Sequence, residues 1–175
     1  AEMHDLGNSS FFYNIHEGNY FRPQEAEGMN QFGFTTERYQ TLGNMHFKGA
    51  FTFHSTNETK RGWGNVMEPY RGNPYIFADI EGGDWQKQYY YMNAATSSGL
   101  LFNLFHVGIE AHYEVHTGAR QNDPRPLNNT NNIWIRPGIL FPVGNQFLIG
   151  ISGYYQNRNE SLSMNVVNSD FQHRI

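Results

Sequence analysis

The sequence predicts an all-β fold: an antiparallel transmembrane β-barrel, of which about six or seven strands lie in this chain, with short turns on one side and long loops on the other. Two patterns predict it. Apolar and polar residues alternate with a period of two, in one segment for about 15 residues, whereas a strand of a soluble protein usually has about 5–6. Short turns also alternate with long polar segments along the chain, which is typical of outer-membrane barrels.

The composition supports a β-fold and excludes several other classes. The chain has 175 residues, enough for one domain, and it contains 14 Phe and 11 Tyr. It has no cysteine, which excludes disulfides and thiolate metal sites. Its net charge of −4 provides no basic surface, so we expect no nucleic-acid partner. The longest apolar stretch, 100–109, is much shorter than the ~20 residues of a membrane-spanning helix.

The clearest strand is predicted at 101–115. Its odd positions are mostly apolar and include Phe105, Val107 and Ile109, whereas its even positions from His106 onward are mostly polar or ionisable. In an outer-membrane barrel, one such face contacts lipid and the other faces the lumen. The same alternation recurs at 45–53, 133–141 and 147–158.

Three hairpins follow from these strands, at about 30–54, 85–116 and 132–158. A weaker strand is predicted at 10–21. Turns are expected at 41–44, 97–99 and 142–145, where Gly, Asn, Ser and Pro gather, and long loops at about 55–84 and 117–131. Residues 1–175 are thus expected to form a single barrel segment. Because a closed barrel needs about 8 strands, we expect the chain to be part of a longer protein.

Two loop segments carry a family resemblance. One comprises 74–79, Pro-Tyr-Ile-Phe-Ala-Asp, followed by Gly-Gly-Asp at 82–84, and the other is 120–128, which begins Arg-Gln-Asn-Asp-Pro. Through these segments the chain resembles a family of outer-membrane β-barrels from Bacteroidota that has no assigned function. The resemblance implies a full barrel several hundred residues long, from which this sequence departs by stopping early. It implies a fold and a location, and no activity.

Six ionisable residues are predicted to face the lumen and are candidates for a functional site. They are His106, Glu110, His112, Glu114, His116 and Arg136. On one strand His112 and His116 lie about 13 Å apart, too far to bind the same metal ion. A site on His112 and Glu114 would need a third ligand from an adjoining strand, which the sequence does not identify. We therefore expect neither a metal nor another cofactor, and interpret these residues as lumenal groups that hydrate and pair.

Arg120, Asp123 and Arg125 lie in a loop that two prolines stiffen. They have two interpretations: a brace built on an Arg-carboxylate contact, or a docking element for a ligand or partner at the barrel rim. A brace should affect folding first when it is mutated. The sequence favours the brace.

Trp63, Tyr70 and Tyr75 are further loop candidates. Together with Trp85 they could form a sugar-binding platform, since aromatic faces and nearby amides suit carbohydrate hydroxyls. The competing interpretation is loop packing and an interfacial aromatic belt, which we favour. Glu81 and Asp84, beside two glycines, are interpreted as part of a turn and not as an acid/base pair.

The leading functional hypothesis is a non-enzymatic outer-membrane barrel, acting as an uptake pore or as an accessory subunit of a transport complex. The sequence contains no serine-nucleophile elbow, zinc-protease motif, P-loop or dinucleotide fingerprint. The expected location is the bacterial outer membrane. The expected partners are outer-membrane lipid and, among proteins, other outer-membrane proteins or surface lipoproteins.

The alternative is a secreted soluble β-sandwich or barrel that binds carbohydrate. The soluble fold predicts that a set of apolar strand residues points into a core, whereas the barrel directs them to lipid and places His106, Glu110 and His112 inside. The residues of this set are Phe47, Phe51, Val107, Ile109, Ile149 and Ile151. An enzyme embedded in the outer membrane is a third hypothesis, and it would need Ser or Asp beside a lumenal or rim histidine.

Overall fold

The computed structural model describes residues 5–72, 75, 77–144 and 146–167. Three residues named above, Pro74, Ile76 and Asn145, lie outside this part. The described chain is all-β, and it contains no helix and hence none that is long and apolar enough to cross a membrane. Its eight strands are β1 (Leu6–Glu17), β2 (Gly28–Leu42), β3 (Met45–Arg61), β4 (Gly83–Ser98), β5 (His106–Arg120), β6 (Arg125–Val143), β7 (Phe147–Ser152) and β8 (Tyr155–Asn165).

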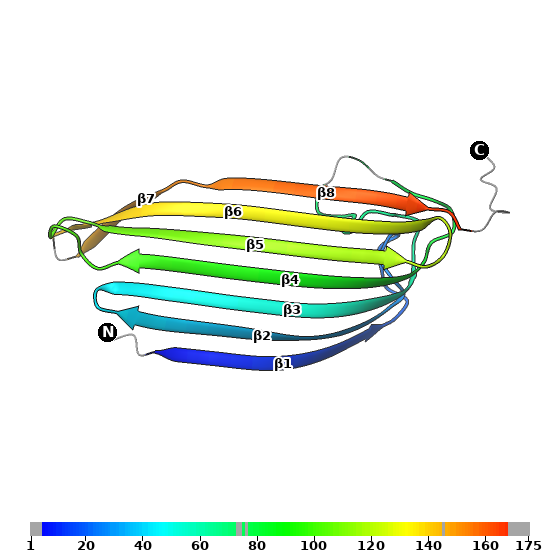
Figure 1. The fold of residues 1–175 in the computed structure, drawn as a ribbon, viewed down its shortest axis with the longest axis horizontal. Helices are drawn as coiled ribbons and strands as arrows, with labels where there is room; N and C mark the ends of the chain where they lie inside the picture. Colours follow the sequence, from blue (N-terminus) through cyan, green and yellow to red (C-terminus); the bar gives the residue numbers. More distant parts are fainter. Residues whose placement is uncertain (1–4, 73–74, 76, 145, 168–175) are drawn as a thin grey trace.

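All the strands belong to one open antiparallel sheet (Figure 1). Each strand pairs with the next from β1 to β7, and β8 pairs with β6. The two halves of β6 have different partners, because β7 pairs with 138–143 and β8 pairs with 125–135. Thus β7 and β8 follow one another along the same edge of the sheet, with β1 at the opposite edge.

The connections differ at the two ends of the sheet. The turns 43–44, 99–105 and 144–146 lie at one end, the left in Figure 1, which we call the turn end. The connections 18–27 and 121–124 lie at the other, the loop end, together with the described residues of 62–82, which we call the 62–82 loop. The alternation of short turns with longer loops therefore separates into two ends, except that 121–124 is itself short.

Several sequence-based boundaries are wrong. β3 continues to Arg61, so the loop expected at 55–84 is only 62–82, and the single strand expected at 147–158 is divided into β7 and β8. β5 begins at His106 and not at 101, because Leu101–Phe105 closes into a turn with Phe102 and Asn103 at positive φ of 50° and 58°. The long loop expected at 117–131 is only 121–124, since β5 continues to Arg120 and β6 begins at Arg125. The polar run of Asn and Thr at 128–132 resembles a loop in sequence, but it alternates between the two faces of the sheet.

One face of the sheet, the apolar face, carries a band of apolar side chains. Cross-strand rings connect Phe11 to Phe34, Phe34 to Phe53, and Phe53 to Tyr90, with ring centroids 5.0–6.1 Å apart. No element of the described chain covers this band, and Ile109 and Ile151 are 47% and 71% exposed. Nearer the loop end of β4 to β6 the same face becomes polar, as at Gln88, Thr117 and Asn131, and it is mostly uncharged, with Arg125 as one exception.

The apolar band crosses the strands obliquely. Phe11, Phe34, Phe53, Tyr90, Val115 and Asn131 form one row across six paired strands. On β1 the apolar residues continue from this row toward the loop end, to Ile15, whereas on β6 they begin beyond it at Ile133 and continue toward the turn end. A band that is level with a bilayer crosses strands obliquely when the strands tilt by about 35–45°, as barrel strands do.

The opposite face, the polar face, carries His54, Tyr89, His116 and Thr130 in adjoining strands. Its loop-end half is covered by the 62–82 loop and contains most of the buried side chains. Only a few of these are apolar, including Met67 and Trp85. The rest are polar or charged, so the interior of this fold is a polar network and not a hydrophobic core.

Candidate functional site

The candidate site is the polar face where the 62–82 loop folds back over it. The two arms of the loop pair with each other, since the N–H of Asn65 donates to the carbonyl of Phe77 (2.7 Å) and the N–H of Asp79 donates to the carbonyl of Trp63 (3.0 Å). A Cβ on Gly62, at the start of the loop, would lie 2.3 Å from the backbone carbonyl oxygen of Pro23. The loop can therefore approach the 18–27 connection closely only with glycine at this position.

Asp79 anchors the second arm of the loop, which includes Phe77 and Asp79. Its Oδ2 accepts hydrogen bonds of 2.6 Å from Nη2 of Arg120 and of 2.6 Å from Nδ2 of Asn65, and its Oδ1 accepts one of 2.8 Å from the N–H of Glu81. Burial alone would raise the pKa of Asp79, but these hydrogen bonds outweigh it and the pKa lies below its usual value. The carboxylate thus stays charged and fixes the loop to the start of the 121–124 connection.

The first arm of the loop, 63–67, lies over Glu58, Arg61 and Lys87 of the sheet. Lys87 Nζ donates to Oε1 of Glu58 (2.6 Å), and Nη2 of Arg61 donates to the carbonyl of Val66 (2.6 Å). The Arg61 guanidinium also lies 4.7 Å from the ring centroid of Trp85. Both buried cations therefore have an acceptor or an aromatic face, as buried charges require.

Glu114 is the centre of a second cluster under the loop tip. Arg71 donates to both of its carboxylate oxygens (3.1 and 3.0 Å), and Nδ2 of Asn132 donates to Oε1 (3.0 Å). His112 and His116 each place Nε2 at 3.3 Å from this carboxylate. The loop tip is thus joined to β5 and β6 through charge-assisted contacts.

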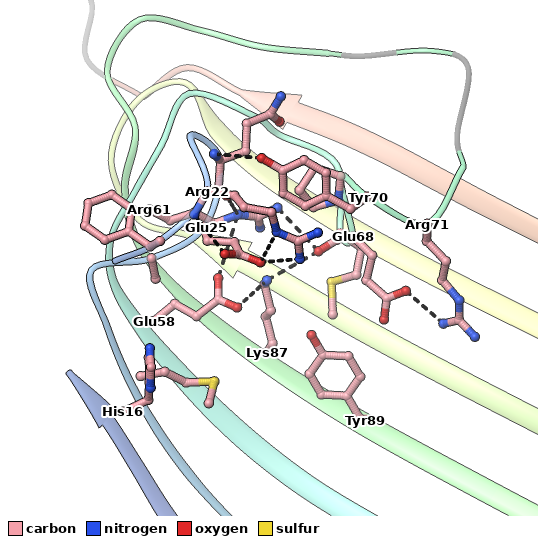
Figure 2. Close-up of a pocket in the computed structure, with 16 residues that line it drawn as sticks. His16, Arg22, Glu25, Glu58, Arg61, Glu68, Tyr70, Arg71, Lys87 and Tyr89 are labelled. Atoms are coloured by element: carbon pink, nitrogen blue, oxygen red, sulfur yellow. Dashed lines mark hydrogen bonds and ion pairs between the residues drawn. The ribbon is translucent and has the colours of Figure 1, made fainter. Parts of the chain in front are cut away.

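A cavity of about 490 Å³ opens between the 18–27 connection and the 62–82 loop (Figure 2). Arg22, Glu25 and Tyr70 line its mouth, and Glu58, Lys87 and Tyr89 contribute to its floor. The Arg22 guanidinium lies 3.9 Å from the ring centroid of Tyr70 and makes a hydrogen-bonded ion pair with Glu25. These hydrogen bonds from Arg22 lower the pKa of Glu25.

All six residues predicted to face the lumen lie on the polar face. The structure brings His112, Glu114 and His116 into contact and places Glu110 3.9 Å from Arg136. His106 lies apart, with Nδ1 3.2 Å from the carbonyl of Ser98. Among the described residues no group of three or more His, Asp or Glu side chains is arranged to hold a metal ion.

The predicted loop candidates separate into buried and exposed residues. Arg120 is only 1% exposed, which corrects the hypothesis that it docks a partner at the rim. Arg125 contacts Asp123 at 3.1 Å at the surface, in the manner of a brace. Trp63, Tyr70 and Tyr75 are 42%, 45% and 71% exposed, but Trp85 is fully buried, so the proposed four-residue aromatic platform does not form.

Several residues of this site escaped the sequence argument. Asp79 and Arg120 are far apart in the chain, and nothing in either segment indicates that they pair. Lys87 offered a usable signal, because it lies two residues from both Trp85 and Tyr89 on a predicted strand. Residues two apart on a strand share a face. Arg22 and Glu25 lie in a connection where no period exists to place them.

The chain matches a protein-family model over its whole length. Residues 1–175 match the model of a "Family of unknown function (DUF6850)". No curated protein and no solved structure matches the chain. Because the family model spans all 175 residues, the chain belongs to this family of unknown function, DUF6850.

Proposed function

We propose that the chain is part of the wall of a non-enzymatic β-barrel in the bacterial outer membrane, acting as an uptake pore or as an accessory subunit of a transport complex. The observation that carries the proposal is the inverted polarity of the sheet. No described element covers its apolar face, whereas its polar face is covered by a loop that buries ion pairs and amides. Contact with lipid would remove the apolar side chains of this face from water.

The dimensions of the sheet support a membrane location. Strands β2 to β6 contain 15–19 residues each, longer than the about 9–11 residues that a tilted strand needs to cross the hydrocarbon. On β3 to β6 the excess lies at the loop end, where the apolar face becomes polar, whereas on β2 it lies mostly at the turn end, at Thr36 to Gln40. Strands β3 to β6 would thus cross the bilayer in their turn-end half and project from it in the other half, with the long loops outside the cell.

The 62–82 loop supports a role at a lumen. It folds onto the polar face and would narrow a barrel on its inner side. Both edges of the sheet are open, and in lipid their backbone groups would need further strands as partners. In this proposal β1 and the β7–β8 edge are therefore closed by additional strands, and the polar face encloses the lumen.

The soluble alternative needs a second layer over the apolar face. No described element supplies one, and the residues that should form its core include Phe47, Val107 and Ile149, which are 37%, 37% and 60% exposed. The loop covers the face that a soluble sandwich would direct to water. These exposures favour the membrane proposal over a secreted carbohydrate-binding module.

Fractionation of cells that express the complete reading frame tests the proposal. We expect the protein in the outer-membrane fraction, with a gel mobility that changes when the sample is boiled in detergent, because a closed barrel resists unfolding by detergent alone. Recovery as a soluble protein with unchanged mobility would contradict the proposal and support the secreted module.

A further inference from the structure

We infer that the cavity between the 18–27 connection and the 62–82 loop binds an uncharged carbohydrate. The inference rests on the proposed uptake function and adds a substrate class to it. The cavity is about 490 Å³, within the range of small-molecule sites, and its lining combines ion-paired side chains with aromatic rings (Figure 2).

The charges at the cavity are already compensated within the protein. Arg22 pairs with Glu25, Arg71 with Glu68 at 2.8 Å, and Lys87 with Glu58 at 2.6 Å. The fourth cation of the lining, Arg61, is buried, lies 3.7 Å from the same Glu58 and donates to the carbonyl of Val66. A net-charged ligand would have to separate one of these pairs and leave a charge without its partner. An uncharged ligand avoids this cost.

The same ion pairs have capacity left for hydroxyl groups. A guanidinium has five N–H donors and a carboxylate about four acceptor sites, and each internal ion pair uses only some of them. Arg22, Glu25 and Arg71 have side chains that are 61%, 38% and 37% exposed, so their remaining donors and acceptors are accessible. Planar groups that bind in a bidentate manner match the neighbouring hydroxyls of a sugar ring.

Aromatic and apolar groups supply the second part of the recognition. Phe21 and Tyr70 are 39% and 45% exposed at the cavity, and Met29 and Pro69 also line it. The apolar C–H faces of a sugar ring can pack on such groups while its hydroxyls meet the ion pairs. An ion-paired and partly aromatic lining therefore fits an uncharged sugar better than a fatty acid or an anion.

The location suits an incoming solute. The lining comes from the polar face of β1 to β4 through His16, Met29, Glu58 and Lys87, and from two loops at the loop end. In the proposed barrel this is the outer mouth of the lumen. A solute from outside the cell would meet this cavity before it reached the membrane-spanning part of the lumen.

The test is binding of the purified, detergent-folded full-length protein to an array of uncharged α- and β-glucans, mannans, xylans and galactans, with sialylated and sulfated glycans and short peptides on the same array. We expect binding to at least one uncharged class. Calorimetry with that oligosaccharide should show an affinity lowered about tenfold or more by Tyr70→Ala and by Arg22→Ala. Tyr20→Ala is the control, since Tyr20 lies in the 18–27 connection with Arg22, is 99% exposed and does not line the cavity.

Binding to none of the uncharged glycans would overturn the inference, as would binding only to charged glycans or peptides. Equal affinity of the Tyr70→Ala, Tyr20→Ala and unchanged proteins would also overturn it, because the sugar would then bind elsewhere. Fractionation of the same strains separates this failure from failure of the membrane proposal. An outer-membrane protein without sugar binding refutes the cavity assignment alone, and a soluble protein that binds sugar refutes the barrel alone.

Discussion

The two ends of the polar face differ in what covers them. At the loop end the 62–82 loop reduces the exposed fractions of Lys87 and His116 to 4% and 1%, whereas at the turn end the side chains of Glu110 and Arg136 remain 33% and 49% exposed. On β3 to β6 the apolar face changes in parallel, from mostly uncharged polar residues at the loop end to the apolar band at the turn end. The loop therefore holds the loop end together through polar contacts, whereas no described element covers the turn end.

The largest effect should come from breaking the polar anchor of the loop. Asp79→Ala leaves Arg120 buried without its carboxylate, which should lower the free energy of unfolding by about 3–5 kcal/mol. Urea unfolding of the detergent-folded protein measures this change.

The control is Glu27→Ala, which removes the Lys60–Glu27 pair (3.0 Å) whose side chains are 75% and 46% exposed. Solvent screens that pair, so its loss should change stability by less than about 1 kcal/mol. Equal effects of both variants would show that the loop is not anchored through Asp79.

A charge placed in the apolar band tests the other end of the comparison. Ile109→Arg should destabilise the protein folded in lipid by about 2–4 kcal/mol, because the guanidinium would meet hydrocarbon. Thr117→Arg, on the same strand and face but outside the band, should cost about 0–1 kcal/mol. Unfolding by denaturant in lipid vesicles compares them. If the two variants were equally stable, the band would not lie in the bilayer.

The loop packs on the sheet at Gly118, whereas no described residue packs against Gly49 nearer the turn end. A Cβ on Gly118 would lie 2.6 Å from Sδ of Met67, a fully buried side chain with little room to move aside, so Gly118→Ala should lift the loop and cost about 1–3 kcal/mol. Gly49→Ala, where the Cβ would meet nothing within 4 Å, should change stability by less than about 0.5 kcal/mol. Limited proteolysis within the loop should be faster for the Gly118 variant alone. Unchanged proteolysis would mean that the loop does not rest on β5.

Acid should release the loop with a smaller and graded effect. The pKa of Asp79 is lowered from 3.8 in the folded protein, so its stabilising contribution is present above pH 3.8 and is lost as the pH falls through the lowered pKa. Proteolysis of the loop by an acid-active protease should therefore accelerate below pH 3.8. In Asp79→Asn this acceleration should be reduced, and an identical pH profile in both proteins would assign the effect to other carboxylates.

The sequence predicted the strands better than their ends or their contacts. The period of two identified the two faces of β3 and β5 because each residue type reports which face it occupies. It failed at 101–105, where apolar residues form a turn, and at 117–131, where a strand carries polar residues on both faces. Periodicity cannot distinguish a polar strand covered by a polar loop from a loop.

The candidate site was only partly predictable. Glu114 and its two histidines follow from their common face, but the partners that Arg71 and Asp79 find depend on the path of the 62–82 loop. That path is set by close backbone contacts at Gly62 and by a pairing between loop arms that no local pattern indicates. The same limit applies to the cavity, whose walls come from two connections and four strands.

The most direct test of the central claim is a scan of lipid contact along β5. Because the chain has no cysteine, single cysteines at 107–113 can each carry a fluorophore in the full-length protein folded into vesicles whose lipids have brominated acyl chains. The account predicts quenching at Val107, Ile109, Ala111 and Tyr113 and little at Gly108, Glu110 and His112. Uniform quenching, or quenching absent at every position, would contradict an apolar face in contact with lipid.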